Sequence, residues 1–296
     1  MYQKGYAPHA LFFSLVVTRS MWKKLYPYIT ILRPVNVIIS FIAVYLVLFI
    51  SGGQQYPHLW ISALYAALSA SLICGGSNII NDFFDIEIDK INRPERVMAK
   101  GLISKRGALV YWTVINVAGL YFSSLIGIEC FSIALFSIAL LFVYSSYLKR
   151  TSLMGNLTVS FFTGLAFIYG GVAIGHWKHS VVPALFAFLF HWGREILKDI
   201  EDIEGDRRMF ARTFPIEYGV TSALSLTTVI FLTLIALTLW VYLIEFYNMI
   251  YFWIIVAGMY PAILYTLISM WRDVSKSNMH RLNVLLKVEM FVGLLA

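Results

Sequence analysis

Charged residues are scarce in this chain of 296 residues, and their scarcity excludes a soluble domain. Asp, Glu, Lys and Arg make up 13% of the sequence, against about 25% in typical soluble proteins. Cysteine is also nearly absent, and because Cys74 and Cys130 fall in or beside apolar stretches, no disulfide framework or zinc site is indicated. The net charge is +7 and the mean hydropathy is +0.75. In a chain with so much apolar surface, this modest positive charge indicates basic loops rather than binding to nucleic acid.

What the sequence has instead is a series of apolar stretches near the roughly 20 residues that cross a lipid bilayer as a helix. They predict an all-α, polytopic membrane protein with about nine transmembrane helices in a single bundle around a central cavity. The expected spans are 35–51, 59–81, 108–126, 131–148, 156–175, 181–197, 221–244, 249–270 and 283–296. Residues 10–17 are apolar but too few to span, and no signal-peptide cleavage site follows them. We therefore expect a cytoplasmic arm over residues 1–34 and one transmembrane domain over residues 35–296.

Basic residues lie on alternate loops, which predicts the orientation in the membrane. Five precede the first expected span and six lie between the second and third, whereas Lys178 is the single basic residue of the loops on the other side. By the positive-inside rule, the N-terminus and the basic loops are cytoplasmic. The sequence thus predicts a multi-pass protein of the cell membrane.

An acidic pattern occurs twice, and it indicates two related halves. The pattern D-x-x-D-I-E-x-D begins at Asp82, at the end of the second span, and again at Asp199, at the end of the sixth. Spacings of three and four residues place the aspartates of each copy on one face of a helix. The segments 81–89 and 198–206 are therefore expected to face each other across one cavity.

These carboxylates create an electrostatic problem that requires cations. They lie at helix C-termini, where the helix dipole disfavours negative charge, and they repel one another. Mg²⁺ suits such a site, because it binds one or two carboxylates together with substrate phosphates. Glu195 lies one turn deeper, where ionisable groups tend to be functional, although a structural salt bridge is an equal alternative. We expect His191, one further turn away, to be packed and hydrogen-bonded rather than to face the cavity.

At this point the residues resemble the UbiA superfamily of intramembrane prenyltransferases. The family motif N-D-x-x-D-x-x-x-D is matched by Asn81, Asp82, Asp85 and Asp89. The second motif, D-x-x-x-D, is matched by Asp202 and Asp206, with Asp199 one turn earlier. The stretches 85–94 and 202–207 are most similar to the branch that contains digeranylgeranylglyceryl phosphate synthase, with chlorophyll synthase as a relative.

The resemblance implies an enzyme and a set of site residues. In that branch, Mg²⁺-dependent transfer moves a geranylgeranyl group from its diphosphate, the isoprenyl donor, to a hydroxyl of geranylgeranylglyceryl phosphate. Asn81, Asp85, Asp202 and Asp206 would be the metal ligands, and Asp82, Asp89 and Asp199 would complete the catalytic acidic wall. The expected substrate-binding residues are Arg33, Asn36, Asn81, Arg93, Arg96, Lys100, Tyr144, Lys149 and Glu195. Among the aromatic residues of the fifth span, Phe161, Phe162, Phe167 and Tyr169 are candidates to line the prenyl chain.

The sequence leaves the kind of acceptor open. An acceptor with its own phosphate needs a second basic site, which four residues of the loop after the second span could form: Arg93, Arg96, Lys100 and Lys105. The alternative is that these residues only set the orientation in the membrane and contact anionic lipid headgroups. The main alternative is an aromatic or chlorophyllide acceptor, as in quinone or chlorophyll synthesis. A transporter is a different class, but the carboxylates lie at helix ends rather than at the bilayer midplane. A non-catalytic scaffold is opposed by the presence of both complete acidic motifs.

Overall fold

The computed structural model describes residues 24–208 and 210–295, and all regular elements in these ranges are helices. Residues 1–23, which include the apolar stretch 10–17, lie outside the described part. The longer helices are α2 (Pro34–Ile50), α3 (Pro57–Phe84), α5 (Lys105–Ser124), α6 (Ile128–Ser146), α7 (Met154–Ala173), α8 (Val181–Arg208), α10 (Val220–Leu243), α12 (Tyr260–Arg272) and α13 (Lys276–Leu295). The short ones are α4 (Ile86–Asn92), α9 (Phe214–Tyr218) and α11 (Met249–Trp253), which a π-helical segment (Ile254–Met259) joins to α12.

The helical bundle is confirmed, and each expected span contains a helix. By length and composition, five of the described helices can cross a membrane, or six if the bent pair Lys24–Ile31 and Pro34–Ile50 counts as one span. The chain is therefore a multi-pass membrane protein, while nine crossings stay a prediction. One boundary differs clearly, since α13 begins at Lys276 rather than near residue 283. The reason is tertiary packing, because Met279 and Leu282 are fully buried although polar residues surround them.

The end of the expected arm folds against the bundle. The helix Lys24–Ile31 meets α2 at an angle of 50°, and the bend falls at Arg33, whose φ is 54°. Pro34 favours this break, because a proline disfavours helical geometry in the residue before it. Ile31 is buried against Ile79 of α3 and Ile86 of α4, which fixes Arg33 near the C-terminal end of α3.

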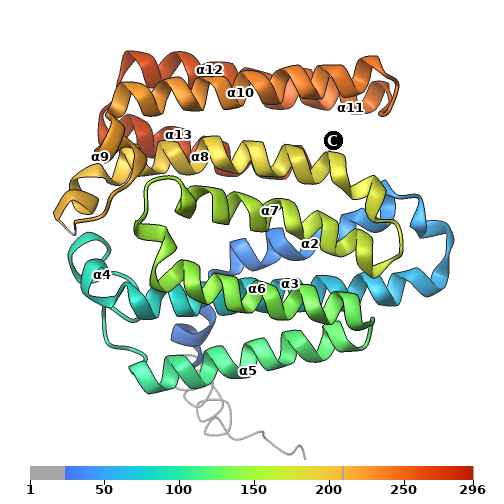
Figure 1. Ribbon diagram of the computed structural model, residues 1–296, viewed down its shortest axis with the longest axis horizontal. Coiled ribbons are helices and arrows are strands. Elements are labelled where there is room, and N and C mark those ends of the chain that lie inside the picture. Colours follow the sequence, from blue (N-terminus) through green and yellow to red (C-terminus); the bar gives the residue numbers. More distant parts are fainter. Residues whose placement is uncertain (1–23, 209, 296) are drawn as a thin grey trace, which may run out of the picture.

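The long helices run alongside one another in layers, and the two acidic helix ends lie at the same end of the bundle. Figure 1 shows α4, which follows α3, and α9, which follows α8, together at the left of the view. The helices α3 and α8 have 28 residues each. A buried cluster that includes Ile196, Phe231 and Ile263 packs α8 against α10 and α12. The fold thus holds both motifs at one end of the molecule.

Candidate active site

One cavity of about 800 Å³ lies between the two acidic helix ends. The first motif contributes Asp85 and Asp89 to its wall, and the second contributes Asp199, Asp202 and Asp206. This confirms the expectation that the segments face each other across one cavity. A volume of this size lies within the roughly 300–1,000 Å³ of ligand pockets in general.

The first motif is not one continuous helical face, contrary to expectation. The helix α3 ends at Phe84 and α4 begins at Ile86, with Asp85 between them at φ −95° and ψ 2°. Asp82 does not line the cavity; its side chain is 4% exposed and pairs with Arg33 and Arg96. These two guanidinium groups explain the difference, because they hold the Asp82 carboxylate within the protein. The second motif does follow the expected geometry, since α8 continues without a break to Arg208.

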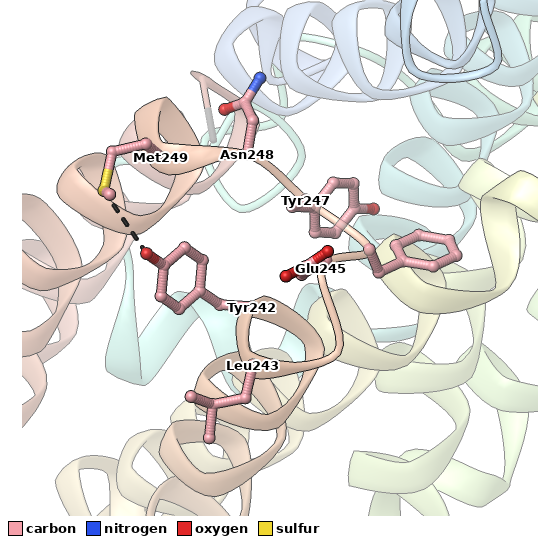
Figure 2. A pocket seen from close by; sticks show the side chains of 7 residues that line it. Tyr242, Leu243, Glu245, Tyr247, Asn248 and Met249 are labelled. Carbon is pink, nitrogen blue, oxygen red and sulfur yellow. Dashed lines mark hydrogen bonds between the residues drawn. The ribbon is translucent and has the colours of Figure 1, made fainter.

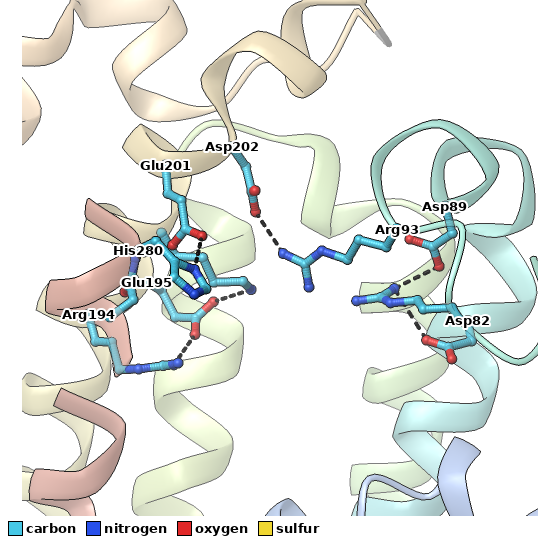
Figure 3. A network of polar contacts seen from close by, with 11 residues as sticks. Asp82, Asp89, Arg93, Arg194, Glu195, Glu201, Asp202 and His280 are labelled. Carbon is cyan, nitrogen blue, oxygen red and sulfur yellow. Dashed lines mark hydrogen bonds and ion pairs between the residues drawn. The ribbon is translucent and has the colours of Figure 1, made fainter. Parts of the chain in front are cut away.

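Basic side chains from the loops after α4 and α6 neutralise the acidic wall. Lys149, which follows α6, donates a hydrogen bond to Asp85 and another to Asn81 Oδ1 at 3.2 Å. Arg93 donates to Asp202 Oδ2 at 3.2 Å, and Figure 3 shows it reaching across from the side of Asp89. Arg96 contacts Asp89 at 2.7 Å. The repulsion predicted from the sequence is thus offset by pairs in which each cation comes from another segment.

Two groups at the mouth of the cavity have perturbed proton affinities. Burial raises the pKa of the Asp89 carboxyl above its usual range, although the charge and hydrogen bond of Arg96 act in the opposite sense. Burial also lowers the pKa of the Lys149 ammonium, and Asp85 offsets part of that effect. Asp89 is therefore a carboxylate able to take up a proton, and Lys149 is a partly desolvated cation that favours an anionic partner.

A deeper polar cluster lies on α8. Glu195 accepts hydrogen bonds from Arg194 at 3.0 Å and from Lys198 at 3.1 Å, so it is both salt-bridged and part of the cavity wall. Asn156 of α7 donates to Asp199 at 2.9 Å. His191 also lines the cavity, and both its ring nitrogens are buried without a hydrogen-bond partner among the described residues. The expectation of a hydrogen-bonded His191 is therefore wrong, because its spacing from Glu195 turns it toward the cavity.

The structure brings most, but not all, of the expected substrate-binding residues to the cavity. Those that line it are Arg33, Asn36, Asn81, Arg93, Arg96, Tyr144, Lys149 and Glu195. Lys100 and Lys105 do not line it and are exposed on the loop before α5 and at its start. Of the aromatic candidates, Phe162 and Tyr169 line the cavity, Phe161 is 42% exposed and Phe167 is packed in the core.

Sequence reasoning missed several lining residues as parts of the site, among them Asn156, Lys198 and Lys287. A signal existed for Lys287, because a lysine within an apolar helix usually faces the protein interior or a cavity. Nothing in the local sequence marks Asn156 as a site residue, because its place in the site depends on its hydrogen bond to Asp199 of another helix.

The donor set suits a hard divalent cation shared with a ligand. Among the described residues, no three His, Cys, Asp or Glu side chains converge on one metal position. Instead, Asn81 and Asp85 lie on one wall of the cavity, and Asp202 and Asp206 on the other. Each wall thus offers the one or two carboxylates that Mg²⁺ takes from a protein when phosphate oxygens complete its coordination.

A second, shallow pocket lies at the other end of the bundle, between α10 and α11 (Figures 1 and 2). Tyr242, Glu245, Tyr247 and Asn248 line it, and Tyr242 donates a hydrogen bond to the sulfur of Met249 at 3.5 Å. With one carboxylate and no basic side chain among its described lining residues, it lacks the paired charges of the larger cavity. The larger cavity is therefore the candidate active site.

Comparison with known proteins shows the family to which the chain belongs. A digeranylgeranylglyceryl phosphate synthase of Methanosphaera stadtmanae is 32% identical over 90% of this chain and 96% of its own length. A solved structure described as giving insights into the biosynthesis of digeranylgeranylglyceryl phosphate synthase in membranes has 29% identity and a TM-score of 0.73, covering 92% of this chain and 96% of that one. A UbiA homolog from Archaeoglobus fulgidus bound to GPP and Mg²⁺ has the same fold at 20% identity, with a TM-score of 0.64 over 91% of this chain and all of that one. The sequence profile of the UbiA prenyltransferase family matches residues 37–294, and the chain therefore belongs to this family.

Proposed function

We propose that this protein catalyses the Mg²⁺-dependent transfer of a geranylgeranyl group from its diphosphate to a hydroxyl of geranylgeranylglyceryl phosphate, a step of ether-lipid synthesis. The names of the relatives support the substrates. The active-site cavity supports the chemistry, because its acidic walls and basic groups suit a magnesium–diphosphate ligand.

The observation that carries the proposal is the placement of Asp85 and Asp202 on opposite walls, each paired with a cation. Lys149 binds Asp85, and Arg93 binds Asp202 at 3.2 Å. A metal–diphosphate ligand can exchange with both pairs, since the carboxylates bind metal and the freed cations bind phosphate oxygens. The A. fulgidus homolog shows that this fold accommodates GPP and Mg²⁺.

The chain's residues have distinct parts in the proposed reaction. Asn81, Asp85, Asp202 and Asp206 would hold Mg²⁺, which would neutralise charge on the departing diphosphate. Lys149 and Arg93 stabilise the negative charge that develops as the bond between the allylic carbon and the diphosphate oxygen breaks. The aromatic side chains of Tyr144, Phe162 and Tyr169 line the cavity and can stabilise the allylic carbocation. The acceptor oxygen then bonds to that carbon, and Asp89 takes the hydroxyl proton.

We further propose that the cavity mouth faces the cytoplasm. The support is the distribution of basic residues, because the loop after α4 carries Arg93, Arg96 and Lys100, whereas the loop before α8 carries Lys178.

The substrate proposal is tested by incubating membranes that contain the protein with labelled geranylgeranyl diphosphate and a panel of acceptors, and then measuring the product mass. We expect the digeranylgeranyl ether from geranylgeranylglyceryl phosphate, in a reaction that a chelator stops. Efficient prenylation of a phenolic acid in its place would establish the aromatic-acceptor alternative.

A further inference from the structure

Three basic side chains from α8 and α13 line the same cavity as Glu195. Arg194 and Lys198 of α8 pair with Glu195 at 3.0 and 3.1 Å. Lys287 of α13 lines the same cavity, and the charges of Arg194 and Arg33 act on its ammonium group. We refer to Arg194, Lys198 and Lys287 as the deep basic cluster.

One cation of the deep basic cluster has no carboxylate partner. Arg194 and Lys198 pair with Glu195, whose side chain is 9% exposed, and Asp199 follows Lys198 on α8, whereas Lys287 forms no ion pair or hydrogen bond with any described residue. The Nε atom of Arg194 is buried and also lacks a partner there. Uncompensated cations inside a membrane protein are costly and mark functional sites. An anionic ligand would supply the missing charge.

Arg194 is separate from the groups that face the diphosphate, while Lys198 lies one turn before Asp202 and connects the two regions. Arg194 precedes Asp202 by two turns of α8, or about 12 Å along the helix axis. Figure 3 shows Arg194 and Glu195 on one side and Asp82 and Asp89 on the other, with Arg93 reaching Asp202 between them. Lys149 and Arg93 are bound to Asp85 and Asp202, so the diphosphate has cations of its own. A distance of this order leaves room for a glycerol backbone and the reacting bond between two phosphate groups.

We infer that the deep basic cluster binds the phosphate of the acceptor, a phosphate monoester of a prenylated glycerol. This inference rests on the proposed function and assigns the acceptor's anionic group within that site. A phosphate monoester carries a charge of about −1.5 to −2 and would supply the partner that Lys287 lacks, and a guanidinium binds its oxygens bidentately. The locus differs from the one expected from the sequence, of which Arg93 and Arg96 line the cavity and pair with Asp202 and Asp89, while Lys100 and Lys105 lie outside it.

Replacement of Lys287 by methionine tests the inference, because methionine keeps the length and apolar stem of the side chain and removes its charge. We expect Lys287→Met to raise the KM for geranylgeranylglyceryl phosphate about tenfold or more and to leave the KM for geranylgeranyl diphosphate at its wild-type value. The preference for this acceptor over geranylgeranylglycerol, which lacks the phosphate, should shrink by the same factor. Lys287→Arg should restore the acceptor KM, since it keeps the charge.

Lys276→Met is the matched control, because Lys276 lies on the same helix but is exposed and outside the cavity. If the methionine variant does not accumulate in membranes, Lys287→Gln takes its place. An unchanged acceptor KM, or an equal rise in KM for donor and acceptor, would overturn the inference while leaving the proposed function intact. Failure of the wild-type protein to convert geranylgeranylglyceryl phosphate would instead overturn the proposed function.

Discussion

Neighbouring aspartates of the first motif have different environments and therefore different expected roles. Asp85 faces the cavity and pairs with Lys149, whereas Asp82 is buried between Arg33 and Arg96. An exposed acidic residue in the same region, Glu87, pairs with Lys90 on the surface. Replacing each carboxylate separately distinguishes a group that acts on the substrate from one that holds the fold.

Asp85→Asn and Asp202→Asn should each lower the rate about 100-fold or more, because an amide is a poor metal ligand and leaves the diphosphate charge uncompensated. Both variants should still insert and elute as folded protein. Glu204→Gln is the control, since Glu204 lies in the same acidic run of α8 but is exposed. Radiolabelled prenyl transfer measures the rates, and near-wild-type turnover in either aspartate variant would contradict the assigned metal site.

Asp82→Asn should chiefly reduce stability. Removing one partner of a buried ion pair costs roughly 3–5 kcal/mol, but Arg33 is 31% exposed, so we expect about 2–3 kcal/mol. The surface pair of Glu87 provides the comparison, and Glu87→Gln should cost less than about 1 kcal/mol. Thermal unfolding in detergent measures both changes. Equal melting temperatures for the two variants would show that the ion pairs of Asp82 with Arg33 and Arg96 do not stabilise the fold.

At the scale of helices, the sequence predicted where elements lie better than how they bend. Hydropathy located the helices, because apolar length decides which segments can cross a bilayer. It did not reveal the break at Asp85, since the burial of Asp82 depends on its pairing with Arg33, on another helix, and with Arg96, in the loop beyond α4. The start of α13 was hidden for a similar reason, because the burial of Met279 is set by its neighbours rather than by local polarity.

The close approach of α2 and α7 depends on a glycine. A Cβ atom on Gly170 would lie 2.6 Å from the carbonyl oxygen of Val44, which is backbone and cannot rotate away. Gly170→Ala should therefore destabilise the protein by about 1–3 kcal/mol. Gly293→Ala serves as the control, because its Cβ would meet only the Met259 side chain at 3.4 Å. Unfolding temperatures test the pair, and an unaffected Gly170→Ala variant would mean that these helices can move apart freely.

For the whole molecule, charge on the loops predicts an orientation that labelling can measure. In a protein with Cys74 and Cys130 replaced by alanine, Lys100→Cys and Lys178→Cys place single thiols on exposed positions of opposite loops. In right-side-out vesicles, an impermeant maleimide should label the Lys178→Cys protein at once and the Lys100→Cys protein only after permeabilisation. The reverse pattern would place the cavity mouth on the outer side.

The overall architecture and the facing acidic walls followed from the sequence, because a repeated motif at equal depth leaves few arrangements. The basic side chains that pair with the carboxylates of those walls could not be predicted from the sequence. Arg93 and Asp202 are far apart in the chain yet form a contact at 3.2 Å, and no local pattern announces it. The deep basic cluster is hidden in the same way, since its members come from α8 and α13.

In the proposed reaction, the two acidic helix ends jointly hold a metal–diphosphate ligand. A structure determined with Mn²⁺ and geranylgeranyl diphosphate tests it most directly, because anomalous scattering locates the metal. We predict metal at about 2.0–2.2 Å from oxygens of Asn81 or Asp85 on one wall and of Asp202 or Asp206 on the other, with the diphosphate between them. Metal and diphosphate bound away from either acidic segment would show that the two helix ends do not hold the ligand together.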